Sequence, residues 1–209
     1  RSIGSLGGGN HFIEFGIPSN DSSALWIVVH SGSRQLGKKI CEFHQNRARK
    51  EQKQVTGRKF QAAVEKIKRE CHDDLVNQKI LQLRAELGIA SGVNNRGLES
   101  LAGEKMYQYL YDMAFTQLYA SYNRVLMMRD ILTILLPNLK IGRSPLESLS
   151  DRSILDRVET IHNFISTRDL IIRKGAVESH SNQKIVIPFN MKDGTWICRG
   201  KGESGWNFS

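Results

Sequence analysis

The chain has 209 residues, of which 40% are hydrophobic, and its 30 Lys and Arg against 21 Asp and Glu give a formal net charge of +9 at pH 7. This length and composition are enough for one substantial globular domain, or one and a half small ones, with a core, and we expect a single domain, residues 1–209. No run of about 18 apolar residues occurs, which excludes a membrane-spanning helix and argues against a membrane partner. The excess positive charge favours a polyanionic partner, and nucleic acid is the first candidate.

The three cysteines are odd in number and widely spaced, which fits a reducing compartment better than a disulfide framework. The chain also begins without the charged, apolar and small-residue pattern of a targeting leader. We therefore expect a cytoplasmic protein.

Two strands are predicted near the start, at residues 11–17 and 25–30, with a turn at residues 18–23. The second is a continuous apolar run of the kind that is buried on both faces of a sheet. From residue 35 the apolar positions recur every three or four residues, with a break at Thr56–Gly57. The positions after this break are Phe60, Val64, Ile67, Cys71 and Leu75. They predict an amphipathic helix with a basic outer face.

A second helical pattern covers residues 99–136, after an expected loop at residues 88–97, and Pro137 ends it. The aromatic residues on one stripe of this helix are Tyr107, Tyr111, Phe115, Tyr119 and Tyr122. Their spacing is that of a helix and not of a strand face. The stripe is therefore interpreted as core and not as a base-stacking platform.

Strand patterns return after a polar loop at residues 142–153. The expected strands are residues 169–173, 184–187 and 195–198. This order predicts an α+β fold in which strand-rich blocks at both ends form mixed sheets around a metal site, with a helical insertion at about 38–136. The terminal strands must then meet, which brings His162 near His11 and His30.

Three histidines are candidate metal ligands, because neutral imidazole is the commonest ligand and each has an amide or hydroxyl side chain beside it. They are His11, His30 and His162, next to Asn10, Ser31 and Asn163, respectively. A single histidine beside an apolar strand is more often a core or surface residue, and the wide spacing of the three does not identify a metal. His44, His72 and His180 lack such neighbours and are interpreted as solvated.

The segment GSLGGGN, residues 4–10, suits phosphate binding because glycine and serine leave the backbone amides accessible. It lacks the offsets of a Walker A loop or a dinucleotide fingerprint, so a flexible turn is the plainer interpretation. Arg34 and the segment 173–175 place cationic groups beside glycines, where they would either clamp phosphate oxygens or be solvated. The basic helix face over residues 47–69 would likewise follow a nucleic-acid backbone or lie in solvent.

Five motifs carry a resemblance to a known family. In chain order they are GSLGGGNHFIE, VVHSGSRQLG, ETIHNFI, DLIIRKGA and IVIPFNMKDGT. In them the chain closely resembles the RtcB-type RNA ligases, which join RNA 3′-phosphate or 2′,3′-cyclic phosphate ends to 5′-hydroxyl ends in tRNA splicing and RNA repair. The resemblance implies GTP and two manganese ions as cofactors, with a guanylylated histidine and an RNA-ppG intermediate. It also implies RNA, as tRNA halves or broken ends, and an archease-type activator as partners.

The resemblance implies roles for single residues as well. His11 would bind one manganese ion, and His30 and His162 the other. Arg34 would hold an RNA phosphate, and Glu14 would read the guanine edge. Besides His11, Glu14 and His162, the residues expected at the guanylate are Asn10, Phe12, Ile13, Asn163, Pro188, Phe189, Asn190, Met191 and Thr195. Of these, Asn190 and Thr195 stand where the family often has serines, which predicts hydrogen bonding that differs in detail.

Some of the family's catalytic residues are expected outside this chain. Its aspartate and bridging cysteine belong to a segment before Arg1, and its nucleophilic histidine belongs to an HGAG motif beyond Ser209. We therefore expect an internal fragment of such a ligase, without the nucleophile and inactive by itself. The alternative is a basic RNA-binding protein without catalysis that uses residues 47–69 and Lys174.

Overall fold

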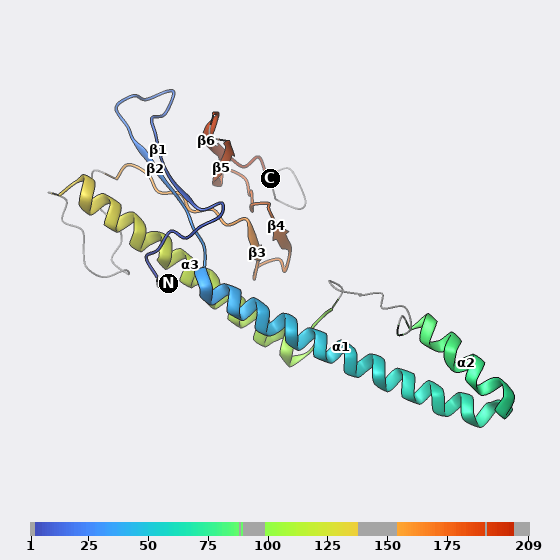
Figure 1. Ribbon diagram of the computed structural model, residues 1–209. Coiled ribbons are helices and arrows are strands. Elements are labelled where there is room, and N and C mark those ends of the chain that lie inside the picture. The colour runs from blue at the N-terminus through green and yellow to red at the C-terminus, as the bar shows by residue number, and fades with distance from the viewer. Residues whose placement is uncertain (1–2, 88, 90–98, 138–153, 191, 203–209) are drawn as a thin grey trace. The chain divides into compact units, whose positions relative to one another are not determined.

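The computed structural model describes residues 3–87, 89, 99–137, 154–190 and 192–202, and it has an α+β fold (Figure 1). Two strands come first, then three helices, then four strands. Their bounds are β1 Phe12–Gly16, β2 Trp26–His30, α1 Arg34–Glu70, α2 Asp73–Glu86, α3 Glu104–Leu135, β3 Asn163–Ile165, β4 Ile172–Lys174, β5 Lys184–Asn190 and β6 Gly194–Arg199. Within these residues no helix has the length and apolar character needed to cross a membrane.

The strands form three separate two-stranded sheets, each of them antiparallel (Figure 1). The prediction of mixed sheets is therefore wrong for the part of the chain that the structure describes. The physical reason is the shortness of the connections, because a parallel pair needs a crossover of a dozen or more residues, whereas an antiparallel pair needs only a turn. Each strand consequently pairs with its neighbour in the sequence.

The first hairpin sets the position of the candidate site. The β1–β2 register pairs Phe12 with His30 and Glu14 with Val28. Phe12 and Glu14 lie on the more covered face of β1, while Ile13 and Phe15 lie on the exposed face. The β2 strand is half-buried along its whole length, which is less than the burial on both faces expected from its apolar run.

The α1 helix continues through Thr56 and Gly57, so the predicted break is wrong. A single glycine costs a helix only about 1 kcal/mol relative to alanine, and the flanking Lys, Arg, Gln and Glu residues are good helix formers. The break comes later, at Cys71 and His72, where the extended backbone of His72 separates α1 from α2. The expected loops at residues 88–97 and 142–153 lie mostly or wholly outside the described residues.

The α3 helix buries a different face from the one predicted. Tyr107, Tyr111 and Phe115 are 66%, 76% and 52% exposed, so these members of the aromatic stripe are not core. The buried positions of this helix are Met113, Thr116, Ala120, Asn123, Met127 and Leu132. The first five of them also recur every three or four residues, and spacing alone does not indicate which of two stripes is covered.

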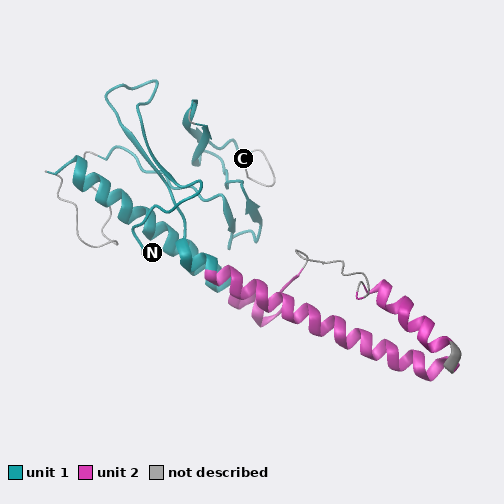
Figure 2. Ribbon diagram, viewed as in Figure 1, with its two compact units in different colours: residues 1–38, 110–209 teal, residues 39–109 magenta. Residues whose placement is uncertain are grey.

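The chain divides into two compact units, coloured teal and magenta in Figure 2. Unit 1 is Arg1–Lys38 with Leu110–Ser209, and unit 2 is Lys39–Tyr109. The prediction of a single domain with a helical insertion stays a prediction.

Contacts between helices hold unit 2 together. The buried His44 packs its ring against Tyr109 with centroids 5.2 Å apart, so its interpretation as a solvated residue is wrong. The Arg84 guanidinium of α2 lies over the Phe60 ring of α1, 5.6 Å from the centroid. Packing and cation–π contacts of this kind connect α1 to both of the other helices of the unit.

Candidate active site

Three histidines from distant parts of the chain lie close together in unit 1. The Nε2 atoms of His30 and His162 are 3.3 Å apart, and their ring centroids are 5.4 Å apart. The ring centroid of His11 lies 5.9 Å from that of His30, because His11 immediately precedes Phe12, the register partner of His30. Phe12 packs edge-on against His30, with ring centroids 5.1 Å apart. The structure thus brings together the three histidines that the sequence singled out.

The geometry of the His30 and His162 pair fits a shared divalent ion. Imidazole nitrogens bind such ions at about 2.1 Å, so two of them on one ion with tetrahedral ligands stand about 3.4 Å apart. Burial lowers the pKa of His30 most, and the electrostatic effects of His162 and then of His11 lower it further. The lowered pKa favours the neutral ring that a metal ligand must have. His30 Nδ1 is buried and has no hydrogen-bond partner among the described residues.

His11 is held differently. An Arg34 Nη1–H donates a hydrogen bond of 3.0 Å to His11 Nδ1, and because a guanidinium only donates, Nδ1 must be the acceptor. The neutral His11 ring therefore carries its proton on Nε2. Burial and then the Arg34 charge lower the pKa of His11. Within the described ranges, no group of three or more His, Cys, Asp or Glu side chains is arranged to hold a metal ion.

Arg34 lies against the glycine-rich segment, and this contact explains one of its glycines. Arg34 Nε–H donates to Ser5 Oγ at 3.3 Å, and its guanidinium covers Gly7 so closely that a Cβ there would overlap it. Gly7 also has φ of +97°, a conformation that side chains other than that of glycine rarely adopt. The segment is therefore shaped around Arg34 and is more than a flexible turn.

Two α3 residues that the sequence did not single out form hydrogen bonds with the backbone of the glycine-rich segment and of the residues that follow His30. Asn123 is 0% exposed and hydrogen-bonds to the backbone at Ser5 and Gly32. Arg124 Nη1–H donates to the Ser31 carbonyl oxygen at 2.9 Å. These two adjacent polar residues interrupt a long helical pattern that is largely apolar. An asparagine buried in such a helix must have hydrogen-bond partners, and this was the available signal in the sequence.

The residues expected at the guanylate fall into two sets. Glu14 and Thr195 meet, with Thr195 Oγ1–H donating to Glu14 Oε2 at 2.8 Å, which joins β6 to β1. Phe12 lies beside His30, and Asn163 Oδ1 accepts the Gly175 N–H at 2.8 Å.

The other expected residues do not join this group. Ile13 is on the exposed face of β1, and Phe189 pairs with Trp196, their ring centroids 5.5 Å apart. Asn190 bonds within its own turn, where Oδ1 accepts the Asp193 N–H at 2.9 Å. Of the rest, Asn10 and Pro188 are exposed, and Met191 lies outside the described residues.

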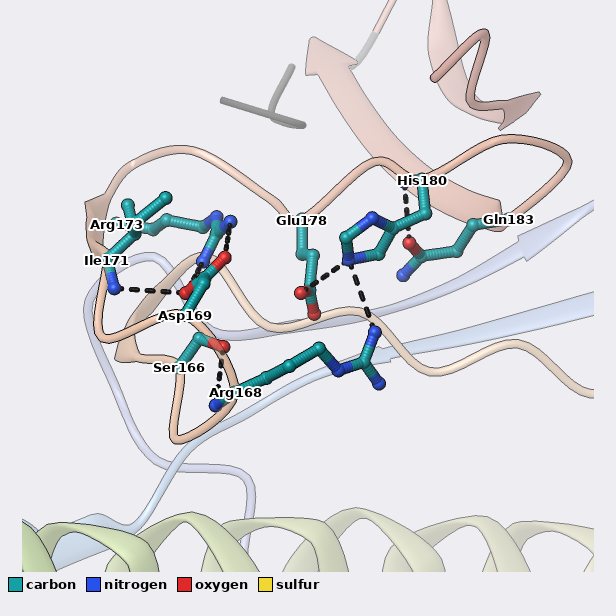
Figure 3. Close-up of polar contacts among 8 residues, drawn as sticks. All are labelled: Ser166, Arg168, Asp169, Ile171, Arg173, Glu178, His180 and Gln183. Carbon is teal, nitrogen blue, oxygen red and sulfur yellow. Dashed lines mark hydrogen bonds and ion pairs between the residues drawn. The ribbon is translucent and has the colours of Figure 1, made fainter. Parts of the chain in front are cut away.

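Polar contacts among its own side chains and those of β4 hold the loop between β3 and β4 (Figure 3). The buried Arg173 donates to both carboxylate oxygens of Asp169, at 3.3 and 2.8 Å, and the Ile171 N–H donates to Asp169 Oδ1 at 3.0 Å. These hydrogen bonds hold the pKa of Asp169 well below its usual value. The Ala176 N–H, just after the end of β4, donates to the His162 carbonyl oxygen at 3.2 Å.

The same loop differs from its sequence prediction in detail. The expected strand at residues 169–173 begins instead at Ile172, because the Asp169 side chain caps a turn there. His180 stands beyond the loop, where its Nε2 is 2.6 Å from Glu178 Oε1 and 3.4 Å from Arg168 Nη1 (Figure 3). These contacts leave it apart from the three converging histidines.

Comparison with known proteins gives a consistent result. The family model described as "tRNA-splicing ligase RtcB" matches residues 1–209. The chain is 28% identical over 209 residues to the RNA-splicing ligase RtcB of Escherichia coli K12, and 27% identical to the RNA-splicing ligase RtcB1 of E. coli ATCC 25922. Both alignments cover 97% of this chain but 42% of the relative, so the chain spans about two fifths of the length of these relatives. No solved structure gave a significant match.

Proposed function

The chain belongs to the tRNA-splicing ligase RtcB family, whose model covers all of it, and from this membership we propose that the protein acts as an RNA ligase. The reaction would join RNA 3′-phosphate or 2′,3′-cyclic phosphate ends to 5′-hydroxyl ends, in tRNA splicing or RNA repair. The finer proposal is a reaction that depends on GTP and manganese and passes through a guanylylated histidine and an RNA-ppG intermediate.

One observation supports the metal part of the proposal, namely the 3.3 Å approach of the His30 and His162 Nε2 atoms. These two residues would hold one manganese ion, and His11 would contribute to a second. Divalent ions at such a site would neutralise charge on phosphate oxygens and so lower the barrier to phosphoryl transfer. To serve in this way His11 must lose its contact with Arg34, whose guanidinium is then free to bind a phosphate.

Glu14 suits the reading of guanine. A carboxylate can accept both the N1–H and the N2–H of the guanine edge, which no other standard base offers together. The Thr195 hydroxyl, donating to Oε2, would hold the carboxylate in place for this contact. Asn163, whose Oδ1 is occupied by the Gly175 N–H, would offer its amide hydrogens to a phosphate.

RNA is the proposed partner, with GTP and an archease-type activator beside it. The net charge of +9 supports a polyanionic substrate. The α1 helix adds exposed cations that suit the RNA backbone, which are Arg58, Lys59, Lys66 and Arg69. The alternative of an RNA-binding protein without catalysis has no support in the comparisons.

The proposal is tested by His30→Ala and His162→Ala in the protein from the full reading frame. We expect either change to abolish ligation of an RNA with 3′-phosphate and 5′-hydroxyl ends in the presence of GTP and manganese. His72→Ala is the matched control, because His72 is exposed in unit 2 and makes no side-chain cap hydrogen bond. Near-normal ligation by either site variant would contradict the metal assignment.

A further inference from the structure

Two neighbouring residues of α3, Asn123 and Arg124, contact all three segments that lead to or from the site histidines. The first segment, at Gly4 and Ser5, precedes His11, and the second, at Ser31 and Gly32, follows His30. The third includes Glu159, three residues before His162. Nothing in the proposed chemistry uses either α3 residue directly.

Asn123 joins the first segment to the second. Its Oδ1 accepts the Gly4 and Ser5 N–H groups at 2.7 and 3.0 Å. Its amide nitrogen donates to Ser31 Oγ at 3.0 Å and lies 3.2 Å from the carbonyl oxygens of both Ser5 and Gly32. The side chain is fully buried, and in such a setting a satisfied polar network imposes one geometry on the groups that it joins.

Arg124 joins the second segment to the third. Its Nη1–H donates to the Ser31 carbonyl oxygen at 2.9 Å, and its Nε–H donates to Glu159 Oε1 at 3.1 Å. The Ser121 hydroxyl holds the other carboxylate oxygen of Glu159 at 3.0 Å. Since Ser31 adjoins His30, this bridge ties the backbone beside one histidine to the segment that leads to the other.

We propose that Asn123 and Arg124 are positioning residues that hold His30 and His162 at the separation which a shared divalent ion requires. The inference rests on the proposed function and deepens it. Groups that orient metal ligands from behind affect metal affinity even though they do not touch the ion. A purely structural role would lower stability without a specific effect on metal binding.

The test measures the affinity for manganese ions alone, without GTP or RNA, by electron paramagnetic resonance of the free ion during titration. Asn123→Asp keeps an acceptor for Gly4 and Ser5 but loses the donor to Ser31 and Gly32. Arg124→Lys keeps the charge but cannot bridge Ser31 and Glu159 with one planar group. We expect each change to weaken manganese binding about 10-fold or more, the range seen when groups behind metal ligands are replaced.

Thr116→Ala is the matched control. Thr116 is buried on α3 in unit 1, and its hydroxyl donates at 2.8 Å to the Met113 carbonyl oxygen of the same helix. It should lower the thermal unfolding temperature and leave manganese affinity unchanged. If Asn123→Asp does not fold, Arg124→Lys and Glu159→Gln decide, because both members of that ion pair are partly exposed.

The outcomes separate the two proposals. If the unaltered protein binds no manganese, the metal assignment and with it the proposed function fail. If the unaltered protein binds manganese and the folded variants bind it equally well, the positioning role is overturned and the proposed function stands. Equal weakening by Thr116→Ala would also overturn the positioning role, because it would trace the effect to general destabilisation.

Discussion

The hydrogen bond between Thr195 and Glu14 joins parts of the chain that are 181 residues apart in sequence. Through this contact Thr195 of β6 holds the side chain of Glu14 on β1, the residue proposed to bind the guanine edge. A double-mutant cycle of Glu14→Ala, Thr195→Val and the combined variant isolates its energy from the other effects of each change.

The expected coupling follows from the geometry of the pair. Its 2.8 Å length is that of a good hydroxyl–carboxylate hydrogen bond. Hydrogen bonds to charged groups contribute about 1.5–3 kcal/mol net when they are buried. Both side chains are half-buried here, so water competes for each group, and we expect a coupling of about 1 kcal/mol.

The assay is urea unfolding followed by tryptophan fluorescence. Trp26 on β2 and Trp196 on β6 belong to unit 1, so their fluorescence reports the unit that contains the pair. A control cycle of Glu14→Ala with Thr116→Ala should give no coupling, because the Thr116 hydroxyl bonds within its own helix. A Glu14 and Thr195 coupling as small as that of the control would refute the contact.

Two further changes test the supports of the site. Gly7→Ala should lower the free energy of unfolding by about 1–3 kcal/mol, because alanine is strained at a φ of +97° and overlaps the Arg34 guanidinium, whereas Gly8→Ala, which meets open space, should change little in the same urea assay. Asp169→Asn should destabilise the protein at pH 7. The depressed pKa means that the carboxylate stabilises the fold above its unfolded-state pKa of about 4 and that this contribution is lost as the pH falls below it. The stability difference should therefore shrink in acid, and a difference that stays constant in thermal melts from pH 7 to pH 3 would contradict this assignment.

Local patterns in the sequence predicted most of the secondary structure. The strands at residues 11–17 and 25–30 are confirmed as β1 and β2, and the strands at 184–187 and 195–198 as the longer β5 and β6. Alternation and turn residues determine such hairpins over short distances. The sequence missed the short β3, because three residues carry too little periodicity to stand out.

The sequence singled out the three histidines that the structure brings together. It did not single out the α3 residues that contact the segments around them. His11, His30 and His162 each stand next to a recognisable polar neighbour in a motif, and the structure places their rings close together. Asn123 and Arg124 carry no such mark, since their partners are backbone groups and a glutamate far away in the sequence. Tertiary packing also determines which face of α3 is buried. The local sequence therefore did not indicate that the aromatic stripe would be exposed.

The local pairing of the three hairpins has a consequence for how the site is stabilised. His30 and His162 are separated by 132 residues, so their approach closes a long loop and costs chain entropy that no single hairpin offsets. A divalent ion shared by the two rings would act as a reversible cross-link across that loop. Binding only the folded chain, it would add about 2.7 kcal/mol of stability at a concentration 100 times its dissociation constant. The ion would then stabilise the folded state in addition to its role in catalysis, and removal of the metal would lower the stability of unit 1.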